Sequence, residues 1–358
     1  MPAIRPLHLA AEIGGPPRYD AGWYVELARL AEDGALDFVT LQDSFDRPGP
    51  DALAVLSRVA PTTERIGLVP VVTTTHTEPF HVSTSLATLD WVSGGRAGWF
   101  VGVSDTPAQA RLFGRRRAAP AAALWREAGE VAEVSARLWD SWEDGAEIRD
   151  RPTGRFIDRD KLHHVDFEGT GFSVRGPSTV PRPPQGRPVT VIDGTAGPAA
   201  ETAARHADVV LVRAGRPEEA AVLRERLRAR AADHGRDPDT LRVLAALTVH
   251  LGDGERPLDP GLESAPRTTA GAGGPRYRGG PAGLAQLITG WHGAGAVDGF
   301  HLTPAEPRRD LERLVNGTVA LLQHRSLFRT FHPGGTLREH LGLARPANRY
   351  TSARGVVR

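Results

Sequence analysis

The sequence contains no cysteine, which excludes disulfide bonds, thiolate nucleophiles, cysteine-type zinc sites and iron–sulfur clusters. It has a single lysine, Lys161, so it lacks both a GxxxxGK phosphate loop and a barrel-strand lysine for a Schiff base. No GxGxxG follows an apolar run, and neither GxSxG nor HExxH occurs. P-loop, dinucleotide-binding, nucleophile-elbow and zinc-protease chemistry therefore have no support in this sequence.

An excess of charge of one sign is also missing. The chain of 358 residues has 44 Lys and Arg against 43 Asp and Glu, so it has no global field that would attract nucleic acid or a membrane. The apolar stretch from Leu7 to Ile13 is broken by His8 and Glu12, and no later window approaches the roughly 18 apolar residues that span a bilayer. We expect a cytoplasmic protein with no nucleic-acid or membrane partner.

Short apolar runs that alternate with helical segments are the main structural signal. Runs of this kind are typical of parallel strands that are buried on both faces and joined by crossover helices. The eight runs are Ile4–Ala10, Asp37–Gln42, Ile66–Thr73, Ala97–Val103, Val189–Ile192, Asp208–Val212, Leu241–Leu251 and Gly299–Leu302. Eight such strands predict an α/β fold, a closed TIM-type (β/α)8 barrel that forms one domain over residues 1–358.

Two irregular stretches interrupt the alternation. The first, over about 143–188, is an insertion between the fourth and fifth strands, and its residues 164–175 predict a β-hairpin around Glu168–Gly171. The second, over about 252–280, is a loop after the seventh strand; it has few large apolar side chains and is predicted to be mobile over the barrel mouth. The clearest predicted helices are Trp23–Glu32 and Asp310–Gln323.

Histidines are the only residues whose position suggests catalysis from spacing alone. His76 and His81 flank the loop after the third strand, where acid–base chemistry, core packing and helix capping all fit. His301 ends the eighth strand, and its side chain points either into the core or toward the mouth. The adjacent His163 and His164 face opposite sides of an extended segment, so we predict no metal site.

Several longer motifs occur in a fixed order and carry a resemblance. The first group is Thr62–Leu68 (TTERIGL), Ala87–Asp90 (ATLD) and Ser93–Trp99 (SGGRAGW). A second group is Leu138–Trp142 (LWDSW), Val174–Pro177 (VRGP), Pro184–Val189 (PQGRPV), Ala203–Asp208 (AARHAD) and Thr336–Leu343 (TLREHLGL). Together they resemble the bacterial-luciferase-like flavin monooxygenases, in the branch that contains nitrilotriacetate and dibenzothiophene-sulfone monooxygenases.

The resemblance implies a TIM-type barrel, in which the loop over about 252–280 is shortened, and a defined chemistry. Members of this family bind FMN that a separate flavin reductase has reduced, react it with O₂ to a C4a-(hydro)peroxyflavin and oxygenate a small organic substrate. Because no dinucleotide motif is present, the reductant is expected to come from that partner reductase. The family also implies a dimer, either of identical chains or of this chain with a homologue.

The family's ring-binding residues can be placed on this sequence position by position. The resemblance implies that Asp43, after the second strand, and Thr74, after the third, contact the flavin. The family's Gly-Trp-Asn at the fourth strand is here Gly98-Trp99-Phe100, so Phe100 stands where an amide is expected near the ring.

The family's phosphate-binding residues are replaced. Its His and Tyr fall on Ala121 and Trp125, and its Gln-Ala-Gly-x-Ser ends on Ala196. Each lost hydrogen bond to a charged group is worth on the order of 1.5–3 kcal/mol, and Asp193 would add repulsion. Compensation is available from the Trp125 indole N–H and from the run at 115–117, so we predict a degraded, rebuilt FMN-phosphate site.

These observations predict an FMNH₂- and O₂-dependent monooxygenase of a two-component system that acts on a small organic molecule. Two alternatives stay open. The chain is then either a flavin-free supporting subunit of a heterodimeric luciferase-like monooxygenase, or a barrel reused for cofactor-independent chemistry. In the last case His76, His81 and His301 are the candidate catalytic residues.

Overall fold

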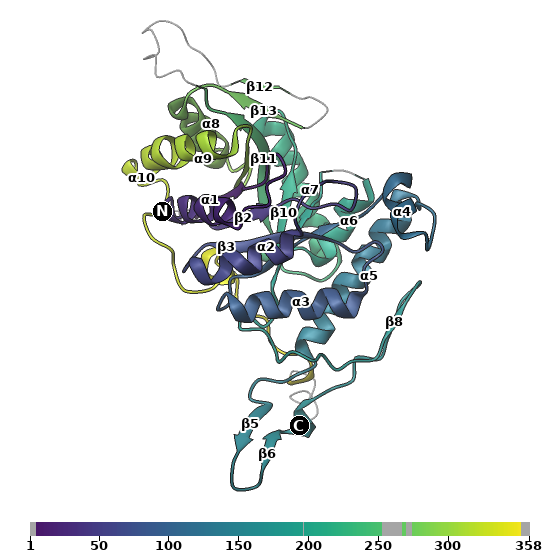
Figure 1. Ribbon diagram of the computed structural model, residues 1–358. Coiled ribbons are helices and arrows are strands. Elements are labelled where there is room, and N and C mark those ends of the chain that lie inside the picture. The colour runs from purple at the N-terminus through teal and green to yellow at the C-terminus, as the bar shows by residue number, and fades with distance from the viewer. Residues whose placement is uncertain (1–4, 196, 253–266, 270–273, 352–358) are drawn as a thin grey trace, which may run out of the picture.

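The computed structural model describes residues 5–195, 197–252, 267–269 and 274–351 and contains a closed barrel of parallel strands surrounded by helices (Figure 1). The barrel strands are β1 (His8–Glu12), β2 (Phe38–Leu41), β3 (Gly67–Thr73), β4 (Gly98–Gly102), β9 (Val189–Asp193), β10 (Val209–Val212), β11 (Arg242–His250) and β14 (Gly299–Pro304). Each strand pairs in parallel with two neighbours, and the pairs β10–β11 and β1–β14 complete the circle. The predicted α/β TIM-type barrel is therefore confirmed.

Every predicted apolar run overlaps one of these strands, and the first strand is displaced toward the C-terminus. The run predicted over Ile4–Ala10 is observed as His8–Glu12, while residues 1–4 lie outside the described part of the chain. Pro6 has no N–H to donate to a ladder, and the pairing with β14 begins at His8. This shift places Glu12, rather than Ala10, at the end of β1.

Helices cover the outside of the barrel. They are α1 (Ala21–Asp33), α2 (Ala52–Val59), α3 (Pro79–Val92), α4 (Pro107–Phe113), α5 (Ala121–Asp140), α6 (Gly197–His206), α7 (Pro217–Asp233), α8 (Pro281–Gly293), α9 (Pro307–Arg313) and α10 (Ala320–His324). The short α11 (Leu337–His340) lies at one end of the barrel instead. Short 3₁₀ turns lie at Ala60–Thr62, Arg159–Lys161 and Pro238–Thr240. None of the helices in the described ranges is long and apolar enough to cross a bilayer.

Both of the clearest predicted helices are present. Trp23–Glu32 lies within α1, whose Tyr24, Leu27 and Ala31 are buried against the barrel. The segment predicted over Asp310–Gln323 begins earlier, at Pro307, and its middle, Leu314–Val319, is a π-helical stretch between α9 and α10.

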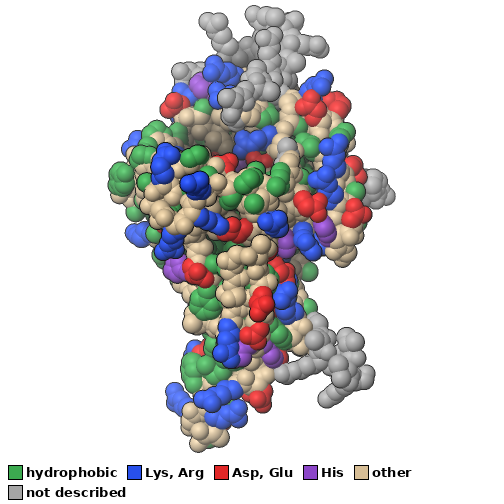
Figure 2. Space-filling model, turned by 90° about the vertical axis from the view of Figure 1, so that its right-hand side faces the viewer, with side chains coloured by type: hydrophobic (Ala, Val, Ile, Leu, Met, Phe, Trp, Pro, Cys, Tyr) green, Lys and Arg blue, Asp and Glu red, His purple; other side chains and the backbone are tan. Residues whose placement is uncertain are grey.

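The insertion between β4 and β9 extends below the barrel (Figure 1). It contains β5 (Glu147–Asp150) with β6 (Arg155–Ile157), and β7 (Phe167–Glu168) with β8 (Ser173–Val174). The second pair is the predicted hairpin, and Phe167 and Val174 pack it on Leu138 of α5. Figure 2 shows this region as the narrower lower part of the molecule, and basic and acidic side chains alternate over the face in view.

The loop after β11 adds strands to the barrel rim. The predicted mobile loop over 252–280 lies mostly outside the described residues, which here include β12 (Arg267–Thr269) and β13 (Arg276–Arg278). β13 pairs with Thr248–His250, the part of β11 that extends past its pairing with β10. This pairing satisfies backbone groups of β11 that β10 is too short to reach.

The lower, N-terminal end of the barrel is plugged. Leu337 and Leu341, in and just after α11, are fully buried and belong to the apolar cluster inside the barrel. Leu337 lies so close to β3 and β4 that a side chain at Gly67 or Gly98 would collide with it or contact it. Access to the barrel interior is therefore left to the opposite end.

Candidate active site at the barrel mouth

The C-terminal ends of the strands form an accessible mouth. Inside the barrel, Phe38 and Leu244 are 0% exposed, whereas Val71, Phe100 and Ala246 retain 9%, 8% and 7% exposure. Leu343, which follows the plug, is 7% exposed at the opposite end, and the other apolar interior side chains on the strands are at most 1% exposed. The residual exposure of Val71, Phe100 and Ala246 therefore marks the layer that solvent reaches from the C-terminal end. These three side chains therefore make the floor of the mouth, where the active sites of such barrels lie.

Polar side chains surround this apolar floor. Successive side chains of a strand point to opposite faces, so residues two positions beyond an interior apolar residue also face inward. The rule places Glu12 beyond Ala10, Thr40 beyond Phe38 and Asp193 beyond Val191. His301 faces inward as well, because its ring lies 6.4 Å from that of Phe38 and its register partners Ala10 and Ala246 belong to the interior cluster.

His301 thus lies in the core and beside the mouth floor at the same time. It is 3% exposed, and its Nε2 lies 2.8 Å from Oγ1 of Thr40. Burial, together with the charge of Arg213, lowers the pKa of His301 to about 4, so the ring is neutral near pH 7.

Asp193 has a partner that the sequence did not reveal. Its Oδ2 lies 2.7 Å from Nε of Arg213, the residue after β10, and its Oδ1 accepts a hydrogen bond from the Thr195 hydroxyl (2.6 Å). The predicted repulsion between Asp193 and a phosphate is therefore countered by the guanidinium beside it.

Asp43 lies two residues after the end of β2, and Thr74 directly follows β3. Asp43 is half-buried, which raises the pKa of its carboxyl, and its Oδ2 accepts the backbone N–H of Ala52 at the start of α2 (2.9 Å). Thr74 is buried, and both its N–H and its hydroxyl donate to the carbonyl of Gly102 (2.9 and 3.2 Å). Both side chains thus hold local structure as well as lying near the mouth.

The structure brings one of the candidate histidines close to Asp43. A cavity of about 260 Å³ is lined by Asp43, Thr73 and His81. His81 is an exposed residue in the first turn of α3, and its Nε2 lies 3.5 Å from Oγ of Ser85.

His76 is separate from this cavity. Its backbone has a φ of 67°, which is strained for a residue with a side chain, and its ring stacks on Phe113 at 4.7 Å. Burial and the charge of Arg116 lower its pKa. His76 therefore packs the loop after β3 against the end of α4.

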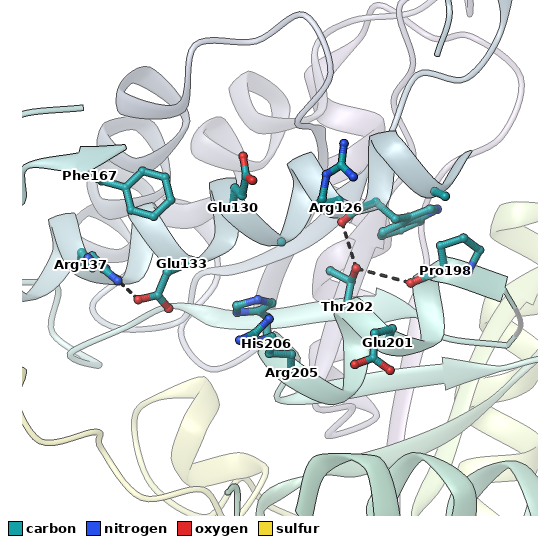
Figure 3. A pocket seen from close by; sticks show the side chains of 13 residues that line it. Arg126, Glu130, Glu133, Arg137, Phe167, Pro198, Glu201, Thr202, Arg205 and His206 are labelled. Atoms are coloured by element: carbon teal, nitrogen blue, oxygen red, sulfur yellow. Dashed lines mark hydrogen bonds and ion pairs between the residues drawn. The ribbon is translucent and has the colours of Figure 1, made fainter. Parts of the chain in front are cut away.

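The residues predicted around the phosphate are only partly placed. Phe100 forms part of the mouth floor, and Ala196 lies outside the described residues. Trp125 is near the start of α5 and lines a groove of about 780 Å³ between α5 and α6. Thr202 of α6 donates to the Trp125 carbonyl (2.9 Å), which joins the two helices on the outside of the barrel. Figure 3 shows this bond as a dashed line from Thr202.

The arginine run between α4 and α5 is exposed and partly engaged. Arg116 makes a double hydrogen bond to Glu127, with N–O distances of 2.8 and 2.7 Å. Arg115 and Arg117 are exposed on either side of it. Within the described ranges, no group of three or more histidine and acidic side chains could hold a metal ion.

Glu12, Thr40 and Arg213 are mouth residues that sequence reasoning did not select. A signal for Glu12 was present, because it is a lone carboxylate in an apolar strand, at the inward-facing spacing from Ala10. Thr40 and Arg213 have no such signal, since a threonine in a strand and an arginine after one are ordinary.

Comparison with known proteins gives a consistent result. The family model described as luciferase-like monooxygenase matches residues 7–259. N-acetyl-S-(2-succino)cysteine monooxygenase of Bacillus subtilis is 31% identical, over 92% of this chain and 91% of its own. Nitrilotriacetate monooxygenase component A of Aminobacter aminovorans is 33% identical over the same shares of the two chains.

A synthase with two different subunits is also among the relatives. One subunit of pristinamycin IIA synthase of Streptomyces pristinaespiralis is 30% identical, over 96% of this chain and 97% of its own, and the other is 31% identical over 55% and 64%. Among solved structures, long-chain alkane monooxygenase has a TM-score of 0.84 at 24% identity and covers 94% of this chain and 95% of its own. The structural likeness supports the barrel fold.

Proposed function

Because the chain belongs to the luciferase-like monooxygenase family, we propose that it is the oxygenase of a two-component system that uses reduced FMN and O₂ on a small organic substrate. The observation that carries the proposal is the open mouth of a barrel whose other end is plugged, with an apolar floor at Val71, Phe100 and Ala246. Such a floor accepts a flat aromatic ring system and keeps water from its lower face.

The residues at the mouth fit the ring end of FMN. Phe100 and Val71 would lie against the isoalloxazine, and Asp43 would accept a hydrogen bond from a ring N–H. When bound, reduced FMN supplies the electrons that activate O₂, and the protein's task is to hold the ring, exclude water and place protons.

The phosphate end fits less well. Arg116 is bonded to Glu127, and Arg213 is bonded to Asp193, so neither guanidinium is fully available. Arg115 and Arg117, exposed between α4 and α5, and the Trp125 indole near the start of α5 are the groups that would replace the family's phosphate ligands. This part of the proposal is a rebuilt phosphate site that binds more weakly than the family's usual one.

The reductant would come from a separate flavin reductase, because the sequence has no dinucleotide-binding motif. Two of the relatives, by their names, are one component of a monooxygenase and one subunit of a synthase, which supports a partner protein. The same names also support the alternative hypothesis, in which the chain assists a catalytic homologue in a heterodimer.

Anaerobic titration with photoreduced FMN tests the proposal directly. Flavin fluorescence and absorbance would be followed for the unmodified protein and for a double variant, Trp125→Tyr with Ala196→Ser, that restores two phosphate ligands. We expect the unmodified chain to bind reduced FMN in the micromolar range, and the double variant to bind about tenfold or more tightly, since one recovered hydrogen bond to a charged group is worth about 1.5 kcal/mol or more.

Binding by the double variant alone would contradict the proposal and favour the flavin-free supporting role, and co-purification with a homologous chain would then be the next experiment. Trp23→Tyr, on α1 away from both α5 and α6, is the matched control and should leave the affinity unchanged.

A further inference from the structure

Three polar side chains on three neighbouring strands form a continuous hydrogen-bonded chain at the mouth. β1 pairs with β14 on one side and with β2 on the other. Thr40 Oγ1 of β2 lies 2.8 Å from Oε2 of Glu12 at the end of β1 and 2.8 Å from Nε2 of His301 on β14. All three residues are buried, with exposures of 4% for Glu12, 0% for Thr40 and 3% for His301.

The hydrogen bonds between Glu12, Thr40 and His301 permit two arrangements of donors and acceptors. The Thr40 hydroxyl has one hydrogen and lies between two groups that are each able to donate or accept. If Thr40 donates to His301 Nε2, Glu12 must be protonated and must donate to Thr40. If Thr40 donates to Glu12, the His301 Nε2–H must donate to Thr40.

The surroundings favour the first arrangement. Burial raises the pKa of the Glu12 carboxyl, although Thr40 and the backbone N–H groups of Gly14 and Gln42 oppose this by bonding to it. Burial and the charge of Arg213 lower the pKa of His301 to about 4, although Asp193 and a hydrogen bond from the ring to the backbone of its own residue oppose this. A neutral ring fits both arrangements, so Glu12 decides between them. Its carboxyl is buried and bonds to uncharged groups of Gly14, Thr40 and Gln42, which together with the raised pKa favours a neutral carboxylic acid.

We propose that Glu12, Thr40 and His301 form a proton relay that delivers the Glu12 proton, through the Thr40 hydroxyl and the His301 ring, to an oxygen atom that is being reduced at the mouth. The inference rests on the proposed function. It deepens that function by naming the internal acid that the oxygen chemistry uses.

The Glu12 Oε2–H proton passes to Thr40 Oγ1 while the Thr40 hydroxyl proton passes to His301 Nε2, and the ring gives its Nδ1 proton to the accepting oxygen. The ring ends neutral as the Nε2–H tautomer, and Glu12 ends as a carboxylate that accepts from Thr40. A proton from water restores the first arrangement after the product leaves.

His301 is well placed for the last step. Its register partner on β11 is Ala246, whose 7% exposure makes it part of the floor that solvent reaches. Thr40 and Glu12 act through the ring and are positioning residues, and the three backbone and side-chain bonds to Glu12 fix its carboxyl between β1 and β2.

Imidazole ¹⁵N NMR on the protein without flavin tests the relay, with His301→Gln used to assign the signals. We expect the Nδ1–H tautomer in the unmodified chain and in Thr40→Ser, which keeps the hydroxyl, and a mixed tautomer in Thr40→Val. Glu12→Gln should keep the tautomer, because glutamine still donates to Thr40. Thr73→Val, at the corresponding end of β3, is the matched control for the NMR signal. Two outcomes would overturn the relay. One is an Nε2–H tautomer in the unmodified chain, and the other is a Thr40→Val variant with the same tautomer as the unmodified chain.

Reoxidation of protein-bound reduced FMN by O₂, followed by stopped flow in H₂O and D₂O over a range of pH, supplies the second readout. We expect a solvent isotope effect in the unmodified chain, and a loss of that effect with slowing on the order of a hundredfold in both Thr40→Val and Glu12→Gln. An unchanged isotope effect in these variants counts against the relay. Failure of the flavin to bind counts against the proposed function only, since the NMR experiment needs no flavin.

Discussion

At the scale of single residues, the motifs that carry the family resemblance supply side chains that hold the turns of the barrel together. Arg96, in the segment Ser93–Trp99, is 3% exposed and uses its guanidinium to bond Ser93, Ala60, Thr63 and Ile66 at 2.7–3.0 Å. These partners lie in the turns before β3 and β4. One planar group therefore fixes both turns at the plugged end of the barrel.

Arg96→Lys should destabilise the protein by about 2–4 kcal/mol, because a lysine cannot reproduce the five bonds of the guanidinium and leaves buried carbonyls unpaired. Denaturant unfolding measures the change, and the same substitution at exposed Arg58 of α2 is the control, expected within about 0.5 kcal/mol. Equal stability of the two variants would show that the Arg96 bonds contribute little.

The positions of these motifs explain why the fold could be predicted from the sequence and most of the mouth residues could not. Asp90 and Gln185 come from two of the matched motifs and are bonded at 2.6 Å, and Arg338 and Asp208 come from two others and are paired at 2.9 Å. These pairs hold the barrel together, so the motifs that contain them carry information about the fold. The mouth residues are isolated polar positions in apolar strands, and only the closing of the barrel brings Glu12 to His301.

At the scale of elements, the π-helical stretch Leu314–Val319 between α9 and α10 lies where this helical segment packs closely against α8. Gly317 lies in the π-helical stretch between α9 and α10, and a Cβ there would come within 2.6 Å of Cβ of Pro281 at the start of α8. The neighbouring Thr318 hydroxyl donates to the Pro281 carbonyl at 3.0 Å. The irregular turn thus lets two helices approach with almost no side chain between them.

Gly317→Ala should therefore destabilise the protein by about 1–3 kcal/mol, although alanine has the better helix propensity. Gly290→Ala in α8 is the matched control, since its position is exposed with open space around it, and it should stabilise by about 0.5–1 kcal/mol. Thermal unfolding of both variants measures the two changes in stability. A gain in stability for Gly317→Ala would mean that α8 can shift away.

At the scale of the whole molecule, buried titratable groups set the response to acid. Burial lowers the pKa values of His206, His301 and His340 to about 4, below the ordinary value of 6.5. In the window between about 6.5 and 4 the unfolded chain binds protons that the native chain excludes, so stability is full above about pH 6.5 and falls as the pH drops toward 4. Asp90 has the opposite sign, because burial raises its pKa to about 6 and it holds a proton in the native state.

We expect the melting temperature to fall between pH 6.5 and pH 4.5, with each fully buried ring contributing up to about 3 kcal/mol of the loss and Asp90 offsetting part of it. His340→Leu should flatten the curve, since His340 is 2% exposed. The same change at exposed His324 should leave the slope as it is. A melting temperature that stays constant over this window in the unmodified protein would contradict the account.

The plug at the lower end of the barrel has a consequence for how the chain acquires its structure during translation. β1 cannot pair with β14 until β14, which ends at Pro304, has been synthesised. The interior is sealed only after Leu337 and Leu341 have been synthesised as well. At about 5–20 residues per second, the thirty-odd residues between Pro304 and Leu337 take seconds to be made. Throughout that interval the nascent barrel is open at its apolar base, and this base is the surface that a chaperone working beside the ribosome would meet.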